Sequence, residues 1–112
     1  MSFALTPEDF RRIALGFSGA MESSHMNHPD FRVNGRIFAT LWKENSVVLV
    51  RPDQQSVLVK LSPHVFSPVK GGWGAKGSTT VHLDLADEHS VRMAVTVAWQ
   101  NKVSKSQRVR TP

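Results

Sequence analysis

Two histidines are the first residues whose types and spacing could do chemistry. His25 and His28 form an H-x-x-H pair, and the carboxylates of Glu22 and Asp30 are close by in the sequence. Imidazole and carboxylate groups are ligands that zinc, nickel or iron accept. However, residues 18–29 are predicted to form a loop, which offers no helical scaffold to place both imidazoles on one side. We therefore expect no metal site and no cofactor, with His28 hydrogen-bonded locally.

A glycine-rich segment carries the second chemical pattern. Residues 72–77 (GWGAKG) match G-x-G-x-x-G, which in nucleotide-binding proteins follows a strand and opens a helix. Here a strand follows the glycines, so the context argues against nucleotide binding. We expect the glycines to let the backbone turn around Trp73 and the indole to pack against the domain. A ligand-stacking role for Trp73 is the less favoured alternative.

No arrangement in the sequence predicts catalysis. Ser23, Ser24 and His25 are adjacent along the chain, but a triad needs a base and an orienting group that converge in space. The chain has no cysteine, which excludes thiolate nucleophiles, thiolate zinc sites, iron–sulfur clusters and disulfides. We expect a binding protein with no catalytic residues, not an enzyme.

Basic residues next to aromatic ones suggest a nucleic-acid partner. Arg36 and Arg51 are predicted to share a sheet face with aromatic rings, and Lys70 and Lys76 flank Trp73. Basic side chains can hold phosphates while rings stack on bases. These five residues predict weak binding of DNA without sequence preference.

A second group of residues supports an alternative of another class. His28, Asp30 and Arg32 stand at the start of a predicted strand, while Gly72 and Trp73 lie in the glycine-rich segment. Together they predict a module that binds a small ligand or another protein, centred on the Gly71–Gly74 loop and the strand entry at His28–Arg32. A concave pocket lined by His28 and Trp73 would favour a ligand, and a continuous positive face would favour nucleic acid. The sequence leaves both open, together with the oligomeric state.

Composition and charge bound these hypotheses. The 112 residues suit one domain, and 14 basic against 9 acidic residues give a formal net charge of +5. Residues 102–112 hold four basic residues and no acidic one. We therefore expect a single domain over residues 1–101 and a flexible basic tail over residues 102–112. Short apolar runs predict no membrane span, and the opening residues MSFALTPEDF predict no signal peptide, which favours a cytoplasmic location.

Hydrophobic patterning and turn residues predict the elements that position these side chains. Thr6 and Asp9 form a capping-box pattern, and Asn34-Gly35 is a strong hairpin signal. The predicted elements are a helix beginning at Pro7, strands beginning at Phe31, Arg36 and Ser46, a helix over Pro52–Leu61, a strand over residues 78–83 and a helix after Asp87. The order α-β-β-β-α-β-α predicts an α+β fold, in which helices pack on one face of a mostly antiparallel sheet.

Alternation along the strands predicts which side chains face the core. The predicted core face holds Ile37, Ala39, Leu41, Val48 and Val50. The predicted open face holds Phe31, Val33, Arg36, Phe38, Thr40, Trp42, Val47, Leu49 and Arg51. In the helix over Pro52–Leu61, we expect Val57, Leu58 and Leu61 to point inward.

Three stretches of the sequence carry a family resemblance. They are residues 28–41 (HPDFRVNGRIFATL), residues 71–74 (GGWG) and the pair Ala98-Trp99. Together they resemble the MmcQ/YjbR-like family of small bacterial proteins over about residues 3–103. The resemblance implies a CyaY-like (frataxin-like) α+β fold, also described as a double-wing fold, and a DNA-binding role. It supplies no catalytic residues.

Overall fold

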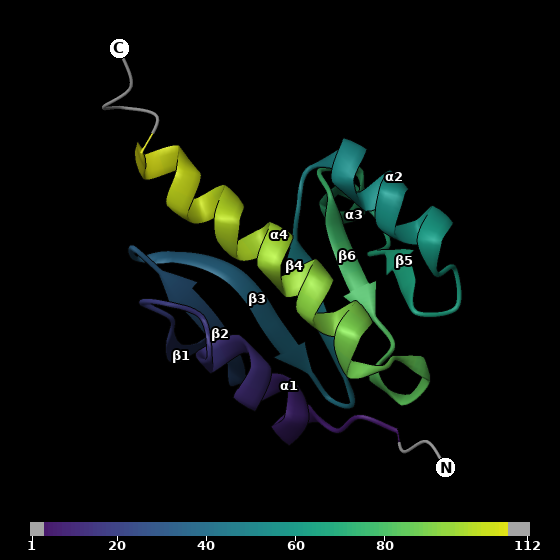
Figure 1. Cartoon of the computed structure of the whole chain (residues 1–112), viewed down its shortest axis with the longest axis horizontal. Helices are drawn as coiled ribbons and strands as arrows, with labels where there is room; N and C mark the ends of the chain where they lie inside the picture. The colour runs from purple at the N-terminus through teal and green to yellow at the C-terminus, as the bar shows by residue number, and fades with distance from the viewer. Residues whose placement is uncertain (1–3, 108–112) are drawn as a thin grey trace.

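A computed structural model describes residues 4–107 of the chain, with side chains described through residue 103. The fold is α+β, as predicted, and its six strands form one antiparallel sheet in the order β1-β2-β3-β4-β6-β5 (Figure 1). The strands are β1 (Met21–His25), β2 (His28–Val33), β3 (Arg36–Trp42), β4 (Asn45–Leu49), β5 (Phe66–Pro68) and β6 (Ser78–Val81). The helices are α1 (Pro7–Leu15), α2 (Pro52–Leu61), α3 (Gly72–Ala75) and α4 (Glu88–Gln107), with a 3-10 turn, η1 (Leu83–Leu85).

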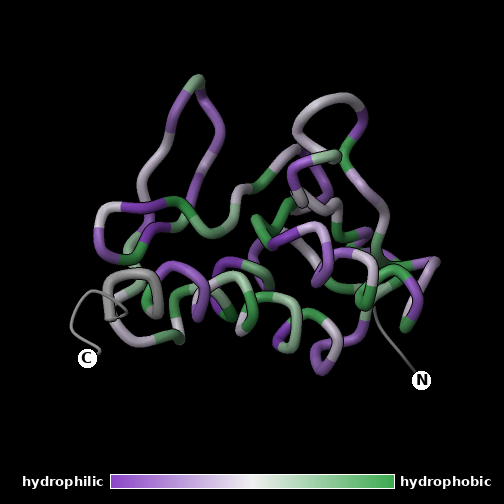
Figure 2. Tube along the Cα trace, turned by 90° about the horizontal axis from the view of Figure 1, so that it is seen from above, coloured by the Kyte–Doolittle hydropathy of each residue, from purple (hydrophilic) through white to green (hydrophobic). Residues whose placement is uncertain are grey.

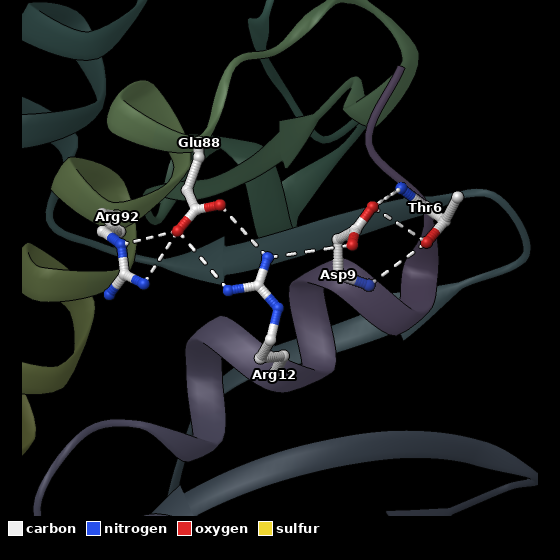
Figure 3. Close-up of polar contacts among 5 residues, drawn as sticks. All are labelled: Thr6, Asp9, Arg12, Glu88 and Arg92. Atoms are coloured by element: carbon white, nitrogen blue, oxygen red, sulfur yellow. Dashed lines mark hydrogen bonds and ion pairs between the residues drawn. The ribbon is translucent and has the colours of Figure 1, made fainter. Parts of the chain in front are cut away.

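The predicted capping box starts α1. Thr6 Oγ1 accepts a hydrogen bond from the Asp9 backbone N–H at 3.2 Å, and Asp9 Oδ2 accepts one from the Thr6 backbone N–H at 2.8 Å. The hydrogen bond from the Thr6 backbone N–H, and after it one from the Thr6 hydroxyl at 3.1 Å, hold the pKa of the Asp9 carboxylate below its usual value. The last turn of α1 reaches α4, because Arg12 donates a hydrogen bond to Glu88 at 3.1 Å; Arg92, on α4, also bonds Glu88 at 2.8 Å (Figure 3). Arg12, and after it Arg92, lower the pKa of Glu88 by hydrogen bonding. The bond from Arg12 ties α1 to α4 at the surface, whereas Arg92 lies on α4 itself.

Helix α4 covers the sheet and seals the core. It packs on β2, β3 and β4 with α1 beside it, and its length shows hydrophobic residues alternating with hydrophilic ones (Figure 2). Asp87 Oδ1 caps its first turn by accepting a hydrogen bond from Ser90 N–H at 2.8 Å. Its apolar face packs into the core: Val91, Ala94, Val95 and Ala98 are fully buried and Trp99 is partly buried.

The prediction of a loop over residues 18–29 is wrong, because this segment contains β1 and the start of β2. Met26 and Asn27 join the two strands with φ of 51° and 67°, and β1 pairs with β2 alone. Every residue of β1 is exposed, so no alternation of apolar and polar residues marks it in the sequence. The predicted element order also lacked β5 and α3, which lie within residues 62–77.

The predicted faces are only partly right, because a bulge interrupts the pairing of β2 with β3. Phe31 pairs with Ala39 and Arg32 pairs with Ile37, which leaves Phe38 as an extra residue. Phe31 and Phe38, placed on the open face by simple alternation, are therefore fully buried, as Val33 and Thr40 nearly are. Of the predicted core face, Ala39, Leu41, Val48 and Val50 are buried and Ile37 is half-buried.

The second and last helices differ from prediction in detail. Helix α2 has the predicted bounds and packs on β5 and β6. Leu58 is buried as predicted, but Val57 and Leu61, which were expected to point inward, are more than half exposed. The backbone of α4 is helical through Gln107, past the predicted domain boundary at residue 101. Residues 108–112 of the predicted tail lie outside the described residues. Between residues 4 and 107, none of the helices has the length and apolar character that crossing a membrane requires.

Candidate functional site

An open cleft of about 510 Å³ lies where the end of β4 meets α3 and the C-terminal part of α4. Its lining residues are Leu49, Val50, Arg51, Pro52, Trp73, Lys76, Ser78, Gln100, Asn101 and Lys102. Three of them carry a positive charge, and the described residues of the lining include no carboxylate. A concave surface with one sign of charge concentrates the opposite charge from solution. The cleft is therefore suited to an anion.

Trp73 stands on one side of this cleft with 70% of its surface exposed. The expectation that its indole packs against the domain is wrong. The reason lies in the neighbouring glycines, because a Cβ at Gly74 would overlap the carbonyl oxygen of Val69. A Cβ at Gly77, where φ is +113°, would overlap the carbonyl oxygen of Val50. The backbone around Trp73 thus lies directly on other backbone, which leaves the ring outside.

Helix α2 holds the Trp73 segment in place through one side chain. Gln55 Nε2 donates hydrogen bonds to the carbonyl oxygens of Gly74 and Ser78, both at 3.0 Å. These bonds bridge the end of α3 and the start of β6. The turn that carries Trp73 and Lys76 is therefore fixed by side-chain bonds as well as by glycine packing.

Arg51 lies between the end of β4 and the start of α2 and lines the same cleft. Its side chain is 63% exposed, and its Nε bonds Asp53 Oδ1 at 3.3 Å. This bond from Arg51 lowers the pKa of Asp53. Asp53 is itself exposed and does not line the cleft. The guanidinium of Arg51 can therefore reach a ligand that is bound in the cleft.

The structure brings together three of the five residues predicted to contact nucleic acid. Arg51, Trp73 and Lys76 line the cleft. Arg36 is exposed at the β2–β3 hairpin and Lys70 is exposed just before α3, and neither lines the cleft. The five predicted residues therefore do not form one continuous group: three line the cleft and two lie outside it.

The residues predicted for the alternative ligand site do not form one pocket. His28, Asp30 and Arg32 lie on β2, and β3 and β4 separate that strand from β6, next to which Trp73 and Gly72 lie. Neighbouring strands are about 4.8 Å apart, so three spacings put about 14 Å between β2 and β6. The predicted combination of His28 with Trp73 is not formed in the cleft.

On β2 these residues make a structural cluster around a buried carboxylate. Asp30 has no exposed surface, and it accepts hydrogen bonds from Arg32 Nε at 2.8 Å and Arg32 Nη2 at 3.0 Å. His25 Nδ1 lies 2.8 Å from Asp30 Oδ2. The bonds from Arg32 lower the pKa of Asp30 by more than burial raises it. Asp30 therefore stays ionised. Its contact with His25 links β1 to β2.

His28 makes a ring contact instead of the expected local hydrogen bond. Its imidazole stacks on the indole of Trp42, with ring centroids 3.7 Å apart. In the described part of the chain, no three His, Cys, Asp or Glu side chains gather as a metal site would require.

Sequence reasoning missed the part of the cleft that α4 supplies. Gln100, Asn101 and Lys102 line it from the last helix, and Lys102 had been assigned to the tail. A signal was available, because Lys102 follows the buried Ala98 by four residues and so falls on the same face of the helix.

The comparison with known proteins agrees with the resemblance seen in the sequence. A family model described as YjbR matches residues 15–101, which include β1 to β6, the Trp73 segment and α4 as far as Asn101. None of the curated proteins matches the chain. The family match covers well over half of the sequence, and the chain therefore belongs to the YjbR family.

Proposed function

We propose that this YjbR-family protein binds DNA weakly and without sequence preference, through phosphate contacts in the cleft, and that it is not an enzyme. One observation carries the proposal: Arg51, Lys76 and Lys102 share a cleft with the exposed Trp73. Phosphate contacts from basic side chains supply most of the affinity in non-specific nucleic-acid binding. A chain without cysteine also fits the reducing cytoplasm, where we place this function.

The position of Lys102 strengthens the charge argument. Without residues 102–112 the chain holds 10 basic against 9 acidic residues, so its positive charge would belong to the tail. Lys102 instead lies on α4 and lines the cleft together with two cations from other elements. The cations that matter are brought together by folding, although they are far apart in the sequence.

Fluorescence anisotropy with a labelled DNA duplex tests the proposal. We expect measurable binding at about 50 mM salt and a linear fall of log K with log salt concentration. Lys76→Gln and Arg51→Gln should each weaken binding and reduce the salt slope by about 1.

Arg36→Gln is the matched control, because it removes the same charge from an exposed site outside the cleft. It should change the affinity by less than about twofold. Absence of binding at about 50 mM salt, or equal losses for Arg36→Gln and Arg51→Gln, would reject the proposal.

A small anionic ligand is the second candidate. The cleft volume of about 510 Å³ is in the range of small-molecule sites, about 300–1,000 Å³, and the Gln100 amide is exposed on its wall. Isothermal titration calorimetry with nucleoside monophosphates distinguishes the two candidates. Saturable binding of a monophosphate that is tighter than that of DNA would favour the small ligand.

A further inference from the structure

We infer that the cleft takes single-stranded nucleic acid, with one unpaired base stacked on Trp73, in preference to duplex. This inference rests on the proposed function and names the class of strand that the cleft accepts. Three features of the described residues support it: the exposed indole on a fixed backbone, the apolar part of the lining, and the hydrogen bonding of the polar groups on the wall.

The indole of Trp73 is exposed, and the backbone that carries it is fixed. Its exposed fraction of 70% leaves most of the ring in solvent. The backbone beneath it is fixed by the close packing at Gly74 and Gly77 and by the two hydrogen bonds from Gln55. Stacking of a base therefore has to order the side-chain torsions of Trp73 but not its backbone, and this smaller entropy loss favours binding.

Part of the cleft lining suits a base and not a phosphate. Leu49, Val50 and Pro52 contribute apolar surface beside the cations. Phosphates gain nothing from such surface, whereas a planar base can bury its faces against it and against an aromatic ring. In a duplex every base is paired and stacked inside the helix, so only an unpaired base can enter the cleft.

The polar groups of the wall predict tolerance of different bases. The oxygen and the nitrogen of the Asn101 amide are both hydrogen-bonded to Gln54, at 3.2 Å and 2.7 Å. We therefore expect Asn101 to form part of the wall and not to recognise a base. The exposed Gln100 amide offers one donor and one acceptor group that can serve any base. Stacking with few hydrogen bonds to base edges gives little sequence preference.

The test compares three labelled probes of about 12 nucleotides with the full chain at about 50 mM salt. They are single-stranded oligothymidylate, an abasic deoxyribose-phosphate strand with the same number of phosphates, and a DNA duplex. We expect oligothymidylate to bind more tightly than the abasic strand, by about 5- to 150-fold for one stacked base. The duplex should bind less tightly than oligothymidylate.

Substitutions of Trp73 assign the difference to the ring. Trp73→Leu should abolish the preference for oligothymidylate over the abasic strand, and Trp73→Phe should keep most of it. Trp42→Phe is the matched control, because Trp42 is also exposed (47%) but stacks on His28 and does not line the cleft. In Trp42→Phe, oligothymidylate should quench tryptophan emission and the abasic strand should not. Circular dichroism shows that each variant is folded.

The outcomes separate this inference from the proposed function. Equal affinity for oligothymidylate and the abasic strand, or a preference for duplex, overturns the inference while the proposed function stands. A preference for oligothymidylate that survives in Trp73→Leu also overturns the inference. If none of the three probes binds, both are rejected.

Discussion

The side-chain amides of Gln54 and Asn101 exchange two hydrogen bonds between α2 and α4. Gln54 Nε2 donates to Asn101 Oδ1 at 3.2 Å, and Asn101 Nδ2 donates to Gln54 Oε1 at 2.7 Å. Gln54 Oε1 also accepts the backbone N–H of Arg51 at 2.9 Å. One amide therefore caps α2, orients the backbone of Arg51 and joins α2 to the α4 wall of the cleft.

Asn101→Ala should lower the free energy of unfolding by about 1–2 kcal/mol, because it removes both bonds and leaves a partly buried Gln54 amide with one fewer partner. Urea denaturation followed by circular dichroism measures the change. Gln100→Ala is the control: Gln100 is exposed next to Asn101, and its loss should change stability by less than about 0.5 kcal/mol. Equal effects of Asn101→Ala and Gln100→Ala would show that the bonds between Gln54 and Asn101 do not contribute to the free energy of unfolding.

Gly74→Ala should destabilise the protein by more than about 3 kcal/mol, since the added Cβ would meet the Val69 carbonyl oxygen and the backbone must move. Gly72→Ala is the matched variant in the same turn, because a Cβ at Gly72 meets no atom within 4 Å. It should be nearly neutral. Chemical denaturation of the two proteins under one condition checks the difference, and a stable Gly74→Ala protein would contradict it.

Asp30→Asn should cost about 1–3 kcal/mol near neutral pH, because it leaves Arg32 without its carboxylate. The pKa of Asp30 is lowered in the folded state, so its contribution is complete above the unfolded pKa of about 3.9 and is lost as pH falls through the folded pKa. The difference in the free energy of unfolding between wild type and Asp30→Asn should therefore narrow only below about pH 4.

Urea denaturation from neutral pH down to about pH 3 measures this gap. The exposed Asp84 in η1 provides the comparison, since Asp84→Asn should leave stability within about 0.5 kcal/mol at neutral pH. A constant gap between wild type and Asp30→Asn across the whole range would count against an ionised Asp30.

Asp53→Asn should tighten DNA binding by about 2- to 5-fold at low salt, because it frees the Arg51 guanidinium and removes a negative charge beside the cleft. Anisotropy titrations at two salt concentrations check the effect, which should shrink as salt screens the charges. Glu44→Gln changes the charge equally at the exposed β3–β4 turn and should have a smaller effect. Equal gains in DNA affinity from Asp53→Asn and Glu44→Gln would show that Arg51 does not contact the DNA.

Elements with strong local signals were predicted from the sequence with correct bounds or starts. The capping box of Thr6 and Asp9 and the turn at Asn34-Gly35 act within a few residues, and both were confirmed. Strand β1 was missed because it lies at the sheet edge, where all of its side chains face solvent. The prediction that Phe38 lies on the open face was wrong because of the bulge between β2 and β3. A bulge depends on how two strands pair, and the sequence of neither strand alone indicates it.

For the candidate site, the sequence supplied residue types but not their neighbours. Arg51, Lys76 and Trp73 were selected from the chemistry of cations beside an aromatic ring, and the structure places them in one cleft. The exposure of Trp73 depends on contacts of Gly74 and Gly77 with Val69 and Val50, which only the folded backbone defines. The position of Lys102 in the cleft was missed because α4 extends beyond the residues that the core requires.

Helix α4 seals the hydrophobic core with Val91, Val95 and Ala98 and lines the cleft with residues 100–102. Occupancy of the cleft is therefore linked to the cooperative unfolding of the whole domain, because an unfolded chain has no cleft. A ligand at 100 times its dissociation constant adds about 2.7 kcal/mol to the native state. The melting temperature thus reports binding directly, and unlabelled compounds and oligonucleotides can be screened by heating alone.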